Sequence, residues 1–207
     1  MSAALTLAET RSRLEAACDA VVANQDRLTK ADQAIGDGDH GVGMARGFKA
    51  AREALAAKPA ATPADLFKTV GMAIMGKSGG ASGAVFGTFF MGMAKGAAGD
   101  VLDAAGYAAA LKEALKAVQA RGGAKAGDKT MIDGLVPAIV GAESGADIAD
   151  ALAKAAAGSL KGAEATANMI ATTGKAKALG ERSRGHMDPG AITLSIVLGA
   201  LSDSAKA

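Results

Sequence analysis

The stretch AAGYAAALKEALKAVQA, residues 104–120, shows how this chain is built. It is rich in Ala and Leu, which favour the α-helix, and the break Arg121-Gly122-Gly123 ends it. The same alternation of Ala- and Leu-rich segments with short Gly-rich breaks continues along the chain. No stretch shows the alternation of apolar and polar residues that is typical of a half-buried strand. The pattern therefore indicates an all-α fold.

We expect helices in eight segments, which cover residues 5–29, 42–57, 62–76, 82–95, 104–120, 131–140, 144–160 and 188–201. Residues 161–173 either extend the seventh helix or form a further one. The breaks are only a few residues long, which favours antiparallel neighbours. Since neither a linker nor a clear repeat interrupts the pattern, the sequence predicts a single domain, residues 1–207, of about eight helices.

The composition excludes several classes of protein. Half of the 207 residues are hydrophobic, but only 3% are aromatic and 28 are Gly, which favours closely packed helices over a sheet. The net charge of +2 shows no basic footprint for nucleic acid, and the single Cys18 excludes an internal disulfide. The longest apolar run, residues 84–94, is shorter than the about 20 residues of a membrane span. Charges at Glu9 and Arg11 interrupt any secretory signal, so we expect a cytoplasmic protein.

The densest polar cluster is DQAIGDGDHG, residues 32–41. It places Asp32, Asp37 and Asp39 among glycines, where a turn can direct several carboxylates at one centre. Hard cations such as Mg²⁺ and Ca²⁺ take oxygen ligands of this kind. The alternative is a solvated loop whose Asp residues cap helices, and the three closely spaced acids favour the metal site.

Two familiar nucleotide motifs occur in the wrong context. Residues 36–41 match G-x-G-x-x-G, but no strand precedes them, and two carboxylates there would repel a pyrophosphate. Residues 71–78, GMAIMGKS, match the P-loop pattern G-x-x-x-x-G-K-S. A P-loop follows a buried strand, whereas residues 62–75 have the pattern of a helix. We therefore expect neither motif to bind nucleotide in its usual way.

Four polar, Gly-rich loops each precede a helix: residues 36–43, 78–83, 122–130 and 185–190. In an up-and-down bundle, helices that run the same way start at the same end, so these loops can share one rim. Helix starts carry unpaired N–H groups and the positive end of the dipole, which suit phosphate. We expect Ser82 to cap one of these helices, Asp128 or Thr130 another, and His40 to donate a hydrogen bond at the rim. Each loop taken alone is also explained as a simple turn, but four such loops together favour a shared site.

Taken together, these loops resemble the L subunit, or nucleotide-binding domain, of the dihydroxyacetone kinase family. The resemblance rests on four motifs that occur in the family's order: GDGDHG at 36–41 with Asp32 before it, SGGASG at 78–83, GDKTM at 127–131, and GERS at 180–183 with GHMDPGA at 185–191. It covers the chain from about residue 30 to residue 191. It implies a barrel-like bundle of about eight antiparallel helices with the nucleotide site at one rim.

The resemblance also implies the site residues. Asp32, Asp37 and Asp39 would hold two Mg²⁺ ions against the phosphates of ADP or ATP, as metal ligands and not as proton carriers. The nucleotide phosphates would meet His40, Gly41, Val42, Gly43, Ala81 and Ser82. The rest of the pocket would be lined by Gly123, Thr130, Met131, Asp188, Pro189 and Gly190. Lys175 stands where the family carries an Arg near the phosphates, so it and His40 would give electrostatic support.

The activity that the resemblance implies is phosphoryl transfer to dihydroxyacetone or a related ketose, held on a separate K subunit. In one branch of the family the L subunit retains ADP, and an M subunit of the phosphoenolpyruvate-dependent phosphotransferase system recharges it. In the other branch ATP exchanges freely. We favour the ADP-retaining branch, because this is a separate short chain. A non-catalytic Mg-nucleotide-binding module is the alternative from another class.

Overall fold

A computed structural model describes residues 3–203, so residues 1–2 and 204–207 of the domain expected over 1–207 lie outside the described residues. Helices dominate the described chain. The α-helices are α1 (Leu7–Ala23), α2 (Gln25–Ile35), α3 (His40–Ala57), α4 (Pro63–Lys77), α5 (Gly80–Gly96), α6 (Ala104–Gly122), α7 (Met131–Glu143), α8 (Ile148–Ala165) and α9 (Pro189–Asp203). Two short 3₁₀ segments, η1 (Thr166–Asn168) and η2 (Lys175–Ser183), lie between α8 and α9.

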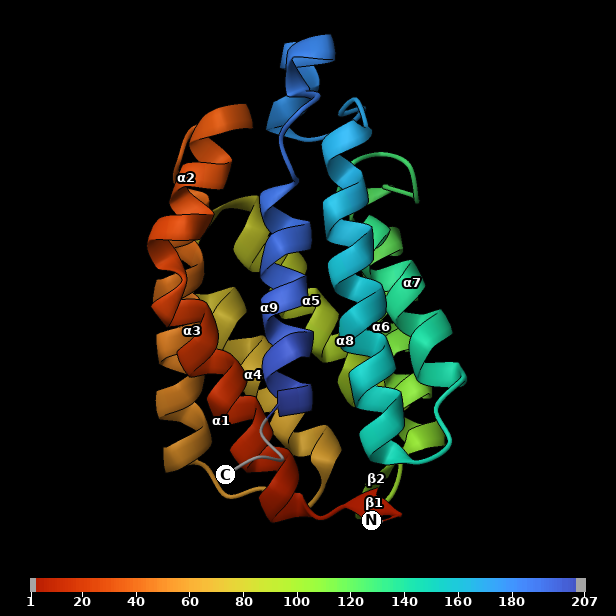
Figure 1. Ribbon diagram of the computed structural model, residues 1–207. Coiled ribbons are helices and arrows are strands. Elements are labelled where there is room, and N and C mark those ends of the chain that lie inside the picture. Colours follow the sequence, from red (N-terminus) through yellow and green to blue (C-terminus); the bar gives the residue numbers. More distant parts are fainter. Residues whose placement is uncertain (1–2, 204–207) are drawn as a thin grey trace.

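Within residues 3–203, eight of the helices form a closed ring. Around the ring, α1 packs on α3, each helix from α3 to α8 packs on the next, and α9 packs on both α8 and α1. Helices that are neighbours in the ring run in opposite directions, as Figure 1 shows. The remaining helix, α2, extends from the end of α1 and packs on α3. The predicted all-α bundle of about eight antiparallel helices is therefore confirmed.

The two ends of the bundle differ. At one end, the lower end in Figure 1, β1 (Ala4–Leu5) pairs with β2 (Leu102–Asp103) in an antiparallel bridge. The prediction of a chain without strands is wrong at this point, because two residues are too few to show a pattern. At the other end lie the C-terminal part of α2, η2 and the loop between α6 and α7.

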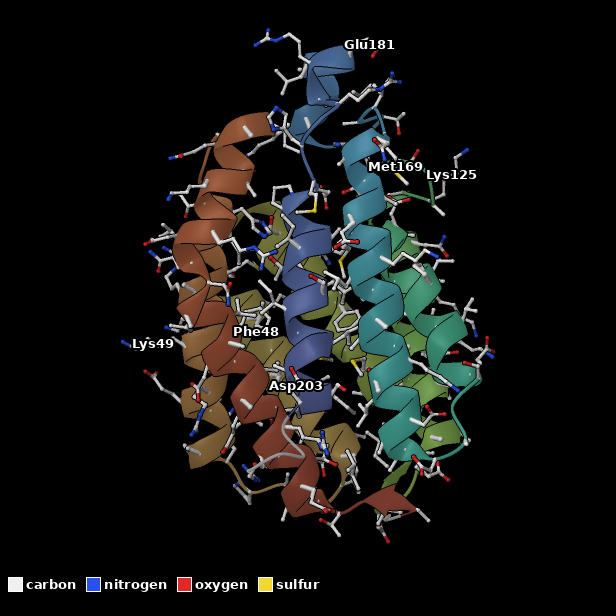
Figure 2. The ribbon with its side chains drawn as sticks, viewed as in Figure 1. Phe48, Lys49, Lys125, Met169, Glu181 and Asp203 are labelled. Atoms are coloured by element: carbon white, nitrogen blue, oxygen red, sulfur yellow. The ribbon has the colours of Figure 1, made fainter. Side chains whose placement is uncertain are left out.

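The core is built from small side chains and a few aromatic rings. Phe48 is fully buried, and its ring meets Phe86 and Phe90 edge to face, with centroids 6.3 and 6.0 Å away. Figure 2 shows Phe48 inside the bundle and the next residue, Lys49, directed away from it. Helices approach closely where a side chain is missing: a Cβ on Gly162 of α8 would lie 2.2 Å from the Asp133 carbonyl oxygen of α7. Small residues therefore allow the ring to close.

Several helix boundaries differ from those expected. The helix expected over residues 5–29 is two helices, which separate at Asn24. The helix α8 ends at Ala165 and η1 follows, so residues 161–173 only partly extend α8. The 3₁₀ segment η2 was not expected, because no apolar period marks it. Within the described chain, no helix has the length and apolar character needed to cross a membrane.

The false P-loop lies in α4. This helix begins at Pro63 with a capping box between Thr62 and Asp65, and it continues to Lys77 through the matching residues 71–77. No strand precedes the motif, since a loop and α3 come before α4. The rejection of a P-loop is therefore confirmed.

Candidate functional site

A cavity of about 430 Å³ opens at the end of the bundle opposite the β1–β2 bridge. The first residues of four helices line it: α3, α5, α7 and α9. The last turn of α2, the first residues of η2 and the C-terminal part of α6 with the loop that follows it also contribute to its wall. The expectation that four Gly-rich loops share one rim is confirmed, because alternate helices of the antiparallel ring start at this end.

Three aspartates lie together on one side of the cavity. One carboxylate oxygen of each of Asp32, Asp37 and Asp39 lies within 4.8 Å of those of the other two. Asp32 lies in the last turn of α2, is 9% exposed, and accepts a 3.1 Å hydrogen bond from the His40 amide. Asp37 lies in the turn between α2 and α3, and Asp39 directly precedes α3. A helix and a turn thus combine to direct three hard oxygen donors at one point.

Lys175, the first residue of η2, reaches this acidic cluster. Its Nζ donates to Asp37 Oδ2 and, over 3.4 Å, to Asp39 Oδ2. The hydrogen bond from Lys175 lowers the pKa of Asp37, and the same hydrogen bond raises the pKa of Lys175. These groups are exposed, so their charges remain screened by water. The arrangement places one cation beside the carboxylates at the cavity mouth.

His40 connects three helix starts. The Thr193 hydroxyl of α9 donates to the Pro189 carbonyl over 3.0 Å, so it accepts from His40 Nε2, which lies 2.8 Å away. In the neutral ring, Nδ1 then accepts from the Ser82 hydroxyl of α5 at 3.0 Å. Burial lowers the pKa of His40, which favours this neutral form. His40 therefore holds the starts of α3, α5 and α9 in a fixed relation.

The loop into α5 is held against α3. The Ser78 hydroxyl donates to the Gly43 carbonyl over 2.7 Å, and Arg46 donates to the carbonyls of Lys77 and Ser78. The N-cap of α5 is Gly79, at φ +74°, so the prediction that Ser82 caps this helix is wrong. Ser82 lies instead in the first turn of α5, where its hydroxyl meets His40.

The opposite wall is formed by the starts of α7 and α9. Of the two caps that the sequence allowed for α7, Asp128 and Thr130, the structure has Thr130, which forms a capping box with Asp133 and is followed by Met131. Asp188 precedes Pro189, and its Oδ2 accepts a 2.8 Å hydrogen bond from the Ala191 amide. Burial raises the pKa of Asp188 to about 7. This wall therefore contains a carboxyl group that titrates near neutral pH.

Most of the residues expected at the site line this one cavity. They are Asp32, Asp37, Asp39, His40, Val42, Gly43, Ala81, Ser82, Thr130, Met131, Lys175, Asp188, Pro189 and Gly190. Gly41 does not line it, because it packs against Gln25 and Thr29 of α2. Gly123 does not line it either: it ends α6 at φ +67°, between two neighbours that do.

Sequence reasoning missed several residues of the site. Arg46 and Lys129 line the cavity, and Thr193 supports His40 from behind. Ser78 also lines it, as part of the Gly-rich loop 78–83 that the sequence had indicated. Arg46 and Thr193 lie inside helices and carry no local signal. Lys129 carried two signals, its place in the GDKTM motif at 127–131 and its position directly before the N-cap of α7.

Comparisons with known proteins show what this chain is similar to. The family model described as the DAK2 domain matches residues 34–203. The chain is 40% identical, over 86% of each sequence, to the PEP-dependent dihydroxyacetone kinase 1, ADP-binding subunit DhaL, of Listeria innocua. It is 37% identical, over 81% of each, to the PTS-dependent dihydroxyacetone kinase, ADP-binding subunit DhaL, of Lactococcus lactis.

One solved structure also matches closely. The dihydroxyacetone kinase from C. freundii, in complex with AMP-PNP and Mg²⁺, superposes with a TM-score of 0.73 at 27% identity. The match covers 99% of this chain and 35% of that one, so this chain spans about a third of the longer kinase.

Proposed function

Because this chain belongs to the DAK2 domain family, we propose that it is the nucleotide-binding subunit of a dihydroxyacetone kinase. In this proposal the chain acts as one domain and holds magnesium-bound ADP or ATP in the cavity at the end of the bundle. The observation that carries the proposal is the meeting of three carboxylates with four helix starts around one cavity. The names of the relatives from Listeria and Lactococcus, both ADP-binding subunits, support it.

The residues on one side of the cavity fit magnesium. Asp32, Asp37 and Asp39 offer only oxygen donors, close enough to converge, and Mg²⁺ prefers carboxylate and phosphate oxygens. We assign these three residues as the ligands of two Mg²⁺ ions. When bound, the metal neutralises charge on the phosphates, which phosphoryl transfer requires. The Mg²⁺ in the C. freundii complex supports the choice of metal.

The helix starts fit the phosphates. The starts of α3 and α5 line the cavity with residues 42–43 and 80–82, and a helix start offers an anion the positive end of the helix dipole. His40 fixes these two starts, and the Ser82 hydroxyl hydrogen is engaged by His40 Nδ1. Lys175 lies beside the metal carboxylates, where its charge can also meet a phosphate. The nucleoside would lie against the opposite wall of the cavity, which is formed by Thr130, Met131, Asp188, Pro189 and Gly190.

The residues of the cavity indicate what this chain would contribute to the reaction and what a K subunit would contribute. The cavity provides metal ligands and anion donors, and in the proposed reaction the ketose is held by a separate K subunit. His40 is a positioning group rather than a proton carrier, since both of its ring nitrogens are engaged. The relatives named as PEP- and PTS-dependent favour an ADP that is retained and recharged by an M subunit.

The first experiment measures the nucleotide that accompanies the purified protein. The protein is desalted in Mg²⁺ buffer and denatured, and the supernatant is analysed by chromatography. We expect close to one ADP per chain. An empty protein that binds added Mg-ATP would favour the ATP-exchanging branch, and one that binds no nucleotide would refute the proposal.

A second experiment tests the metal ligands and the catalytic role. Asp37→Asn should abolish binding of Mg-ADP and leave the melting temperature nearly unchanged, because Asp37 is exposed. The control is Asp100→Asn, which makes the same charge change at an exposed loop residue outside the cavity. Wild-type protein loaded with Mg-ATP and supplied with a K subunit and dihydroxyacetone should then transfer the terminal phosphoryl group to the ketose and leave Mg-ADP. Binding without transfer would instead indicate a nucleotide-binding module.

A further inference from the structure

Lys129 is a buried lysine in an unusual conformation. Its side chain is 2% exposed, although it belongs to the loop that leads into α7. Its φ is +62°, and it is the one residue other than glycine with positive φ in the described range 3–203. A residue with a long side chain adopts this conformation only where its surroundings hold it there.

The ammonium of Lys129 joins two segments that are distant in sequence. Its Nζ donates to the Thr166 carbonyl over 2.6 Å and to the His186 carbonyl. Thr166 directly follows α8, and its hydroxyl accepts a 2.9 Å hydrogen bond from the Asp188 amide. Lys129 and Thr166 together therefore fix the backbone that leads into α9.

Nearby polar and acidic groups offset the cost of burying the Lys129 ammonium. Burial lowers the pKa of the ammonium, while the carboxylates of Asp188 and Asp133 raise it. In return, Lys129 lowers the pKa of Asp188, against the larger effect of burial. A buried ammonium is costly without such partners, so the two carbonyls and two carboxylates explain how it is retained.

We propose that Lys129 is a positioning residue of the nucleotide site, which fixes the wall formed by the starts of α7 and α9. This inference rests on the proposed function. Lys129 lines the cavity together with Thr130 and Met131 on one segment and the Asp188–Gly190 turn on the other. Its two hydrogen bonds hold the second segment against the first. The nucleoside would then meet a preformed surface.

The position of Lys129 leads to a selective prediction. The residues that carry the metal ligands, on α2 and at the start of α3, have no hydrogen bond to Lys129. Loss of the ammonium should therefore weaken nucleotide binding and leave the binding of a metal ion alone unchanged. A residue that merely stabilised the whole bundle would affect both.

The test compares Lys129→Met with Lys125→Met. Both remove an ammonium from the same loop, but Lys125 is exposed and its side chain does not line the cavity. Binding of Mg-ADP is measured by calorimetry, and binding of Mn²⁺ alone by electron paramagnetic resonance. Lys129→Met should raise the Kd of Mg-ADP about tenfold or more, because it leaves buried polar groups without partners. Its Mn²⁺ affinity, and both affinities of Lys125→Met, should stay within about twofold of wild type. Lys129→Arg, which keeps the charge, should recover part of the nucleotide affinity.

The outcomes separate this proposal from the proposed function. Wild-type Kd for Mg-ADP in Lys129→Met, or equal losses of Mg-ADP and Mn²⁺ binding, would overturn the positioning role. Failure of the wild-type protein to bind Mg-ADP would overturn the proposed function itself. If Lys129→Met does not fold, Thr166→Val tests the same wall, because it removes the hydroxyl that accepts from the Asp188 amide. It should raise the Kd of Mg-ADP at least threefold, and an unchanged Kd would count against the proposal.

Discussion

Replacing Gly41 by alanine should damage the metal site without touching any of its ligands. A Cβ at this position would lie 2.2 Å from Thr29 Oγ1, 2.3 Å from the Gln25 carbonyl oxygen and 2.5 Å from the Thr29 amide nitrogen. Ordinary contacts begin at 3.4 Å, and two of these three atoms belong to the backbone of α2. A rotamer change therefore cannot relieve the clash, and α2 has to move away from α3 by about 1 Å.

This movement changes the geometry of the acidic cluster. Asp32 lies on α2, whereas Asp39 directly precedes α3, so the shift separates two of the three carboxylates. It also lengthens the 3.1 Å hydrogen bond from the His40 amide to Asp32 beyond bonding distance. Mg²⁺ and similar ions require ligands in strict geometry. We expect Mn²⁺ affinity to fall about tenfold or more, and overpacking to cost about 1–3 kcal/mol of stability.

The assay is Mn²⁺ binding followed by electron paramagnetic resonance, together with thermal unfolding. Gly199→Ala is the matched control, since a Cβ there would meet no atom within 4 Å and lies in the interior of α9. The control should keep wild-type Mn²⁺ affinity and gain up to about 1 kcal/mol of stability. Wild-type Mn²⁺ affinity in Gly41→Ala would refute the argument that the contact between α2 and α3 sets the metal geometry.

Three further predictions concern stability. Because the pKa of Asp188 is raised in the folded state, to about 7, its contribution to stability is complete below about pH 4 and is lost as the pH rises to 7. Asp188→Asn should therefore flatten the fall in unfolding free energy between pH 4 and pH 7, measured by urea denaturation; an unchanged pH profile would contradict the assignment. Thr130→Ala removes the capping box of α7 and should cost about 1 kcal/mol, or about 2–4 °C in calorimetric melting temperature. Phe48→Ala opens a cavity beside Phe86 and Phe90 and should cost about 3–5 kcal/mol in denaturant unfolding; a loss below 1 kcal/mol would mean that the core can collapse around it.

The helices were predictable because their signals are local. Segments rich in Ala and Leu favour a helix, and glycine-rich breaks end it. The start of α4 is marked by its capping residues alone, in the sequence Thr62-Pro63-Ala64-Asp65. The boundary at Asn24 was missed, because apolar residues keep helical spacing across it. The β1–β2 bridge was missed for a related reason: its two-residue strands depend on a partner about a hundred residues away.

The residues of the candidate site divide in the same way. Asp37, Asp39 and His40 stand together in the sequence, so one acidic, Gly-rich loop was enough to suggest a metal site. Their partners are far away along the chain: Lys175 reaches Asp37 from η2, and Thr193 reaches His40 from α9. Only the closed ring of helices brings these groups within bonding distance.

The sequence by itself determined the helical class, the four Gly-rich helix starts and the group of aspartates, because each depends on residues that are neighbours along the chain. The tertiary structure alone decided that α2 lies against α3 at Gly41, that His40 joins three helices, and that Lys129 is buried between two distant carbonyls. These features arise from the packing of helices around a closed ring, and no local pattern encodes which side chains then meet.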